Sequence, residues 1–458
     1  MRNQFTDALK GHNADYVEIH FEGSEATRVI CRSGSLEEVN RTCSSGGNIR
    51  ALVKGSWGFV SFNRLDKLRE RVALAVDEAR LASGEGFGFP AAEPVVDIVT
   101  QELERSLTDI TLAVKKRLLD EYNSIILGSS KIQSSRIDYR DVKRKVTFVN
   151  SEGSYIEQSK PDIALRLTAI ACQGNEVQQA GLSLGSNGDF SAVERLHDQV
   201  QEIARRAASL LSAPHVKGGE HTIILDPVLA GVFVHEAFGH LSEADFVYQN
   251  KQLYNIMTLG RTFGAKHLNI IDDATIPGLR GSYKYDDEGV PATRTSLIQD
   301  GILVGRLHSR ETAARMGENP TGNARAINYL FPPIVRMTNT FIEPGASCFK
   351  EMLEGIKEGV YVKDWYGGTT SLEMFTFSAG EAYMIRDGKL EEMLRPVVLT
   401  GNVFVTLDNI DAIGNDLNMN QGGGCGKAGQ SPLPVSNGSP HIRIRHCLLG
   451  GAGDKNKY

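Results

Sequence analysis

The chain has 458 residues, 41% of them hydrophobic, and a net charge of −6. These values are ordinary for a globular protein with room for two or more domains, and the acidic balance argues against direct nucleic-acid binding. The N-terminus lacks an apolar signal segment. The most apolar stretch of helical length, residues 224–241, carries two acidic residues and two histidines, so we predict no membrane span. Six scattered cysteines predict no disulfide framework and a reducing cytoplasm.

Strand and helix patterns alternate twice in the N-terminal part. Residues 16–62 are typical of short strands, with a turn at 44–47, and residues 64–83 are typical of a helix with a charged outer face. A second helix is predicted at 111–126, followed by strands at 131–140, 143–151, 154–160 and 163–172 and a helix at 192–211. Strands followed by a helix thus occur twice, which hints at an internal structural repeat. We assign residues 1–212 to one mixed α/β domain.

A change of character follows residue 212. Residues 213–219 contain a proline and two glycines and are predicted to be a linker. A buried strand is expected at 221–225. A helix should then run from Pro227 to about Asp245, because aspartate is a good N-cap and proline is favoured at the first helical position.

The rest of the chain is predicted to be mostly strands separated by turns. The candidate strands lie in residues 267–273, 296–307, 336–344, 359–368, 371–390, 396–407 and 441–451. Asp300-Gly301 and Asp387-Gly388 are typical hairpin turns. We therefore predict an α+β fold of two domains: the mixed α/β domain, and a β-rich C-terminal domain, residues 220–458, that carries a metal-binding helix.

Two histidines with an unusual spacing lie on that helix, in the stretch VFVHEAFGHLSE. His235 and His240 are five residues apart, whereas a common metalloprotease motif spaces them by four. On a regular α-helix five residues turn the side chain by about 140°, so the two rings would point apart. A π-bulge would align them, and so would a helix that ends near Gly239. The alternative is that both histidines are core residues with satisfied hydrogen bonds.

The apolar setting favours a metal. We expect Glu236, which lies between apolar residues, to be buried, and a buried carboxylate needs a cationic partner. A catalytic zinc ion has three protein ligands and one open position. The histidines leave one ligand missing, and Glu243, Asp245 or a distant cysteine are the candidates.

Cys425 is the cysteine that fits best. It lies among five glycines within residues 422–429, where a thiol has no packing reason to be present. A thiolate there would complete a His₂Cys set, which is a known catalytic zinc type, and Lys427 would favour the thiolate. Glu243 and Asp245 would then orient the histidines from behind.

Longer segments resemble the TldD/PmbA metallopeptidases, a family once described as modulators of DNA gyrase. The resemblance covers most of the chain and is dense from about residue 221 onward. The motif H-E-A-x-G-H is matched at 235–240, and other segments of the family are matched at 286–307, 316–326, 336–345, 414–417 and 425–430.

The resemblance implies zinc bound by His235, His240 and Cys425, with Glu236 as the general base. It also implies a hollow dimer whose active sites face an inner cavity and cleave unfolded or short peptides. The dimer would be a homodimer or a heterodimer with a PmbA/TldE-like subunit. This chain carries every motif position, so it looks like the metal-bearing, TldD-like branch.

The sequence therefore predicts zinc-dependent hydrolysis of peptide bonds. The alternative is a non-catalytic, peptide-binding or gyrase-modulating subunit with a structural zinc, for which Cys447 and His441 are possible fourth ligands.

Two further charged groups are ambiguous. Asp286, Asp287 and Glu288 would contact substrate amines or form a solvated turn, and Arg310 and Arg315 would bind peptide carboxylates or form surface salt bridges.

Overall fold

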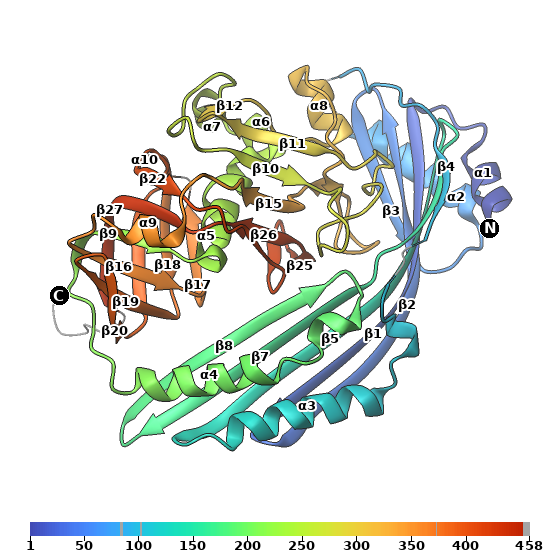
Figure 1. Cartoon of the computed structure of the whole chain (residues 1–458). Coiled ribbons are helices and arrows are strands. Elements are labelled where there is room, and N and C mark those ends of the chain that lie inside the picture. Colours follow the sequence, from blue (N-terminus) through green and yellow to red (C-terminus); the bar gives the residue numbers. More distant parts are fainter. Residues whose placement is uncertain (83–85, 101–102, 372, 452–458) are drawn as a thin grey trace.

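The computed structural model describes residues 1–82, 86–100, 103–371 and 373–451. An arched N-terminal sheet and a C-terminal body built from several sheets make up the molecule (Figure 1). The predicted α+β fold is confirmed. Residues 83 and 372, which fall within predicted elements, lie outside the described ranges. Within the described ranges no helix is both long and apolar enough to cross a membrane.

The N-terminal part builds a single eight-stranded sheet. Its strands are β1 (Tyr16–Arg32), β2 (Ser35–Val53), β3 (Ser56–Phe62), β4 (Val96–Val99), β5 (Ile132–Asn150), β6 (Tyr155–Ser159), β7 (Asp162–Gln173) and β8 (Glu176–Ser186). The order is β3-β2-β1-β5-β6-β4, and β7 and β8 extend the sheet from β5. Both groups of strands therefore share one sheet.

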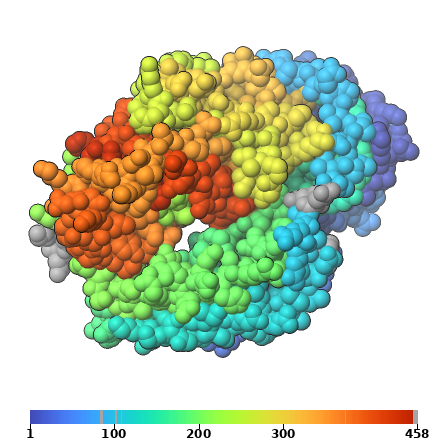
Figure 2. All heavy atoms as spheres, in the orientation of Figure 1, coloured from blue at the N-terminus to red at the C-terminus, as the bar shows by residue number. Residues whose placement is uncertain are grey.

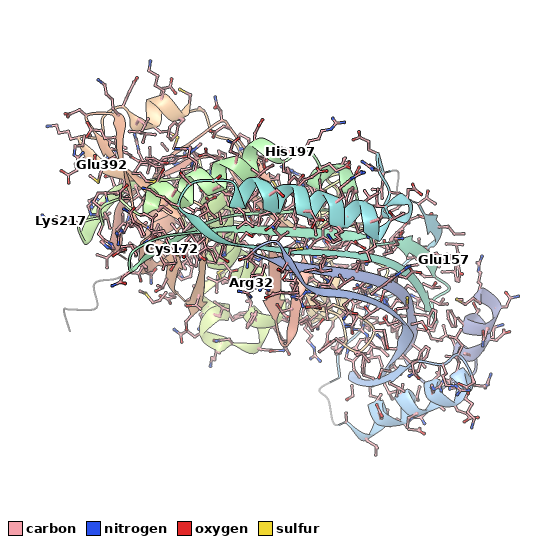
Figure 3. All side chains as sticks on the ribbon, turned by 90° about the horizontal axis from the view of Figure 1, so that it is seen from below. Arg32, Glu157, Cys172, His197, Lys217 and Glu392 are labelled. Atoms are coloured by element: carbon pink, nitrogen blue, oxygen red, sulfur yellow. The ribbon has the colours of Figure 1, made fainter. Side chains whose placement is uncertain are left out.

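Helices cover this sheet. They are α1 (Arg2–Leu9), α2 (Leu68–Leu81), α3 (Leu112–Leu127) and α4 (His197–Leu210), with short 3₁₀ turns at Leu107–Asp109 and Phe190–Val193. Figure 3 shows α3 and α4 lying side by side across the sheet, with His197 at the start of α4. Their buried faces, which include Tyr122 and Ile203, form one core with β5 and β7.

The predicted turn at residues 44–47 is wrong, because these residues lie in the middle of β2. The chain turns instead at Ser33-Gly34 and Lys54-Gly55, all of which have positive φ. Gly46 has a different role: a side chain there would collide with the ring of Tyr329 in the C-terminal part. The glycine thus permits close approach between the two parts of the chain.

The C-terminal part contains two main sheets. The nine-stranded sheet comprises β9 (Gly219–Leu225), β16 (Glu358–Lys363), β17 (Gly367–Ser371), β18 (Met374–Ser378), β19 (Glu381–Arg386), β20 (Lys389–Leu394), β21 (Val397–Asn402), β22 (Ile410–Ile413) and β27 (Ile442–Gly451). The six-stranded sheet comprises β10 (Ile270–Asp273), β11 (Arg294–Gln299), β12 (Ile302–Leu303), β15 (Asn339–Ile342), β23 (Asn418–Asn420) and β26 (Ser436–Ser439). Two short pairs join β13 (Ala324–Arg325) to β14 (Ile334–Val335) and β24 (Gly424–Lys427) to β25 (Gln430–Pro434).

Both hairpin predictions are confirmed. Asp300-Gly301 joins β11 to β12, and Asp387-Gly388 joins β19 to β20. One predicted strand is partly wrong, because residues 403–408 form helix α10 (Val403–Asp408). The side chain of Asn402 accepts hydrogen bonds from the N–H groups of Phe404 and Val405, and this cap starts a helix in a β-branched sequence.

Helix α5 (Pro227–Val234) lies between the two C-terminal sheets (Figure 1). Its predicted start is confirmed, since Asp226 caps it by accepting the N–H of Leu229 at 2.9 Å. All residues from Leu229 to Val234 are buried. Leu229, Ala230, Phe233 and Val234 join side chains of both sheets in one core. A helix that is apolar on every side is stable only where it is enclosed like this. Helix α5 therefore gives the turn that follows it, at residues 235–239, a fixed position.

The C-terminal part also contains four further short helices: α6 (Ala244–Gln249), α7 (Lys251–Ile256), α8 (Arg310–Met316) and α9 (Phe349–Leu353). Figure 2 shows the molecule hollowed between the N-terminal sheet (green) and the C-terminal strands (red and orange).

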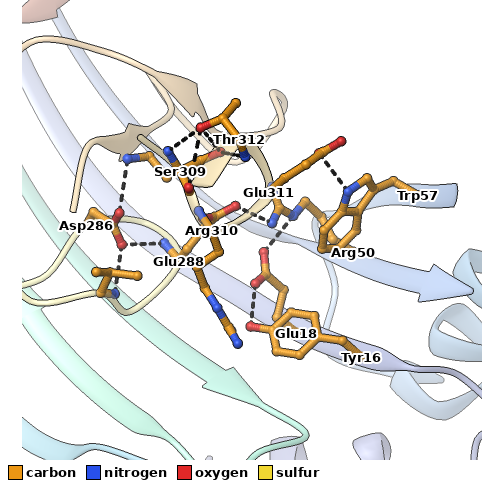
Figure 4. Close-up of polar contacts among 12 residues, drawn as sticks. Tyr16, Glu18, Arg50, Trp57, Asp286, Glu288, Ser309, Arg310, Glu311 and Thr312 are labelled. Atoms are coloured by element: carbon orange, nitrogen blue, oxygen red, sulfur yellow. Dashed lines mark hydrogen bonds and ion pairs between the residues drawn. The ribbon is translucent and has the colours of Figure 1, made fainter. Parts of the chain in front are cut away.

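The acidic run 286–288 is buried between the two parts, so the expectation of a solvated turn is wrong. Glu288 accepts hydrogen bonds from Arg50 of β2 (2.8 Å) and from the backbone N–H of Arg310 (Figure 4). Asp287 pairs with Lys160 at 2.7 Å. Arg310 is also buried, against Glu152 and the rings of Tyr16 and Phe89, and is not a surface residue.

The fifth ambiguous side chain, Arg315, is partly buried. It pairs with Glu311 at 2.7 Å on the same helix. Its contacts therefore match the predicted salt bridge.

Candidate metal centre

The two histidines lie on a π-helical turn. Helix α5 gives way at His235 to the π turn η3 (His235–Gly239), and a 3₁₀ turn, η4 (His240–Ser242), follows. The N–H of His240 donates to the carbonyl oxygen of His235, five residues back. The π-bulge anticipated from the spacing is therefore present, and the helix does not continue unbroken to Asp245. The rings of His235 and His240 have centroids 5.3 Å apart.

Gly239 is required in this turn for its small size. Its φ and ψ of −56° and −50° are ordinary helical values, so backbone freedom is not the reason for glycine. A Cβ at this position would overlap the sulfur of Met337, a fully buried core residue. The turn therefore packs directly against Met337, which lies in the segment just before β15.

Cys425 comes from a segment remote in sequence, on strand β24. Its Sγ lies 3.5 Å from Nε2 of His240, and the ligand atoms of His235, His240 and Cys425 all lie within 4.8 Å of one another. The glycine-rich stretch is a short hairpin with β25. The buried Arg336 donates to the carbonyl oxygen of Cys425 at 2.8 Å and holds this hairpin in place.

The geometry suits a shared metal ion. Bonds of about 2.3 Å to sulfur and about 2.0 Å to nitrogen at a tetrahedral angle place the two ligand atoms roughly 3.5 Å apart, which is the observed separation of Sγ and Nε2. The surroundings of Cys425 stabilise its thiolate form. Although burial raises the pKa of the thiol, His235 and His240 lower it to about 5. Two imidazoles and a thiolate form a donor set that zinc prefers.

Glu243 orients His240 from the side away from Cys425. Its carboxylate lies 3.0 Å from Nδ1 of His240 and 3.1 Å from Nζ of Lys427. Burial raises the pKa of Glu243, but His240 and Lys427 outweigh it and lower the pKa to about 2. An ionised Glu243 keeps the proton of His240 on Nδ1, which leaves the Nε2 lone pair for a metal.

Lys427 has a different role from the one predicted. It bonds to Asp245 at 2.6 Å and to the carbonyl oxygen of Val335 at 2.9 Å, besides Glu243. Lys427 therefore neutralises the charge of the two carboxylates. The thiolate of Cys425 is stabilised by the two histidines instead. Glu243 and Asp245 fall outside the cluster of possible ligands among the described residues.

Glu236 follows His235 within the π turn. It is partly exposed, although it was expected to be buried. In the described part of the chain its carboxylate has no hydrogen-bond partner. A carboxylate that is next to a candidate ligand and is not held by another side chain is free to exchange a proton with a water or a substrate.

The two candidate fourth ligands lie elsewhere. His441 bonds to Asp416 (2.6 Å) and to the hydroxyl of Tyr361 (2.9 Å). Cys447 is buried in β27, where burial raises the pKa of its thiol to about 12. The role of Arg336, which holds the hairpin, could not be predicted from the sequence, because its targets are backbone carbonyls that leave no side-chain motif.

Comparison with known proteins identifies the class. Three family models match, at residues 17–83, 105–211 and 218–451, and are described as domain 1, the central domain and the C-terminal domain of PmbA/TldA metallopeptidases. The chain is a metallopeptidase. It belongs to the TldD/PmbA family, as the resemblance predicted.

Individual relatives agree with this assignment. A metalloprotease of Synechocystis is 47% identical over 96% of this chain and 95% of its own length. A protein of Saccharolobus solfataricus named zinc metalloprotease TldD homolog is 29% identical over 96% of this chain and 97% of its own. The crystal structure of TldE from Thermococcus kodakarensis has the same fold, with a TM-score of 0.76 over 98% of this chain and all of that one, at 17% identity.

Proposed function

We propose that this metallopeptidase is zinc-dependent, with zinc held by His235, His240 and Cys425. The observation that carries the proposal is the convergence of these three ligand atoms within 4.8 Å. The histidines and the cysteine come from segments about 185 residues apart, and a partly exposed glutamate lies beside them.

The residues divide the chemistry between them. Bound zinc would supply a Lewis acid that makes a water more acidic and polarises the scissile carbonyl. Glu236 takes the proton of the attacking water and delivers it to the nitrogen of the leaving amine. Glu243 holds the ring of His240 in place throughout, and Lys427 compensates the charge of Glu243.

A non-catalytic subunit with a structural zinc is less well supported. A structural site has four protein ligands, and the described residues offer three. A bound zinc ion would then have a fourth position for water or substrate. Glu236 would have no purpose beside a closed site.

We propose unfolded or short peptides as substrates. Strand β17 is the edge of the nine-stranded sheet and lies beside the π turn. An extended peptide can add to such an edge through main-chain hydrogen bonds. A folded protein presents few such segments, because its backbone groups are already paired.

We also propose a dimer that encloses a chamber, formed by two copies or with a PmbA/TldE-like subunit. Residues 35–46 of β2 support it: they pair with β1 on one side only, since β3 reaches only Gly47–Val53. Nearly all of them are exposed. A free strand edge of this length invites pairing with another chain.

All six cysteines are free thiols, which supports a cytoplasmic location.

Metal analysis of a cysteine variant tests the zinc site. Cys425→Ser should lose most of its zinc after dialysis and lose peptide cleavage with it, because a hydroxyl is a far weaker zinc ligand than a thiolate. Cys172→Ser, at a half-buried position on β7 outside the cluster, is the matched control and should retain both. Full zinc content in Cys425→Ser would remove the cysteine from the ligand set.

A further inference from the structure

Arg280 connects the N-terminal sheet to the segment that leads to Cys425. Its side chain is buried, and Nε and Nη2 both donate to the carboxylate of Asp162 on β7, with Nη2 at 2.9 Å. Nη1 donates to the carbonyl oxygens of Gln421, at 3.2 Å, and Gly423. One guanidinium thus spans a strand of the N-terminal domain and the backbone just before the cysteine.

Residues 421–423 are confined on two sides. The backbone N–H of Arg280 donates to the side-chain oxygen of Gln421 at 2.9 Å. On the other side Gly422 lies against Ser183 of β8, so closely that a Cβ would overlap the Ser183 carbonyl. In Figure 1 the neighbouring strand β25 lies at the edge of the C-terminal body that faces β8. The segment is therefore seated on the N-terminal sheet.

Cys425 is consequently held from two directions. Arg336 fixes its carbonyl oxygen from within the C-terminal body. Arg280 fixes the preceding backbone, and of these two arginines it is the one that reaches the N-terminal sheet through Asp162. The position of the thiol then depends on how the two parts of the chain are docked.

We propose that Arg280 is a positioning residue for the Cys425 ligand, and that the N-terminal sheet sets metal affinity through the Asp162–Arg280 pair. This inference rests on the proposed zinc site. Residues that orient metal ligands typically change metal affinity by 10- to 100-fold when they are altered. An effect of that size is expected here, although Arg280 touches no ligand side chain.

The Arg280→Lys variant separates the two roles of the guanidinium. Lysine retains the positive charge that Asp162 needs, but its compact ammonium lacks the planar fork with which Arg280 reaches the carboxylate and both carbonyls at once. Metal-free protein would be titrated with Co²⁺, and the near-ultraviolet absorption of a thiolate-to-cobalt bond would be followed. Wild type should show this band, and Arg280→Lys should require at least about tenfold more Co²⁺ to reach it.

Asp97→Asn is the matched control. It removes the ion pair between Asp97 of β4 and Lys284, which also joins the N-terminal sheet to residues near 280 but contacts nothing at 421–423. It should bind Co²⁺ as wild type does. An equal loss in Asp97→Asn would show that any weakened domain contact suffices and would overturn the role of Arg280.

A second variant keeps the test decisive if Arg280→Lys does not fold. Asp162→Asn removes the carboxylate charge that holds Arg280 against β7 and leaves the arginine itself in place. It should weaken Co²⁺ binding similarly. Wild-type affinity and band in either folded variant would overturn the inference. If wild-type protein bound Co²⁺ with no thiolate band, the proposed zinc site itself would fail, and the inference with it.

Discussion

At the scale of single residues, His240 is held through both ring nitrogens. Nδ1 lies 3.0 Å from Glu243 and Nε2 lies 3.5 Å from Cys425. Burial lowers the pKa of His240, but Glu243 and Cys425 outweigh it and raise the pKa well above its ordinary value. The site therefore favours a positive charge between the thiolate and the carboxylate. A divalent cation would provide that charge, and both imidazoles would then be neutral ligands.

Asp226 shows how the cap of α5 makes stability depend on pH. Burial, and then repulsion from Asp364, raise the pKa of Asp226 from 3.8 to about 7. Between pH 3.8 and about 7 the folded chain holds a proton on Asp226 that the unfolded chain has released. Folding therefore becomes less favourable as the pH rises through this range, and the stability that the proton on Asp226 contributes is lost by about pH 7. Asp226→Asn keeps the cap, since asparagine caps as well as aspartate, and removes the titration.

Asp226→Asn should therefore gain stability relative to wild type as the pH rises. Each unit of pKa shift corresponds to about 1.4 kcal/mol, so the gain at pH 8 should be a few kcal/mol larger than at pH 5. Urea unfolding at the two pH values measures it. Parallel curves, with the same difference between variant and wild type at both pH values, would contradict the titration of Asp226.

At the scale of elements, the metal-binding turn was half predictable. The five-residue spacing indicated that a regular helix would not bring the two histidine rings together. Either a π-bulge or a helix end could do so. The turn packs against Met337, about 100 residues away, and no local pattern contains this contact. The hairpin around Cys425 was similarly hidden. Its glycines indicated a loop, whereas Arg336 and Lys427 anchor it through backbone carbonyls.

The contact between Gly239 and Met337 predicts a large effect of one methyl group. Gly239→Ala should destabilise the protein by about 1–3 kcal/mol, as overpacking does in other cores. The same change should cost less in a Met337→Ala background, because the space for the methyl group is then available. Chemical unfolding of the two single variants and the double variant measures this coupling. If the changes in the free energy of unfolding of the two single variants simply add up in the double variant, there is no steric conflict between residue 239 and Met337.

At the scale of the whole molecule, the sequence indicated the α+β class and most strands, but neither their length nor their partners. Strand β5 runs unbroken over Ile132–Asn150, although charged residues near 140–145 divide its pattern in two. Pairing with β1, β6 and β7 holds it extended. Burial of residues 286–288 was equally unpredictable, because their partners Arg50 and Lys160 belong to the other part of the chain.

The free edge of β2 allows the proposed dimer to be tested. Figure 3 shows the β1–β2 hairpin at the rim of the sheet, with Arg32 near its tip. Val39→Lys places a charge on the exposed edge, a substitution that blocks edge pairing in natural proteins. It should shift sedimentation toward the single chain, whereas Leu74→Lys on α2 should not. If the unaltered chain sediments as one copy, both alone and with a PmbA/TldE-like partner, the dimer is refuted.

The most direct test of the account compares the zinc-loaded chain with its Glu236→Gln variant on a diverse library of unfolded peptides. Fragments would be identified by mass spectrometry and zinc would be measured in both proteins. Wild type should cleave, and Glu236→Gln should bind equal zinc but turn over about 10²- to 10⁴-fold more slowly, as expected for loss of a general base. Cleavage by the variant at the wild-type rate would contradict the proposed role of Glu236 and the mechanism built on it.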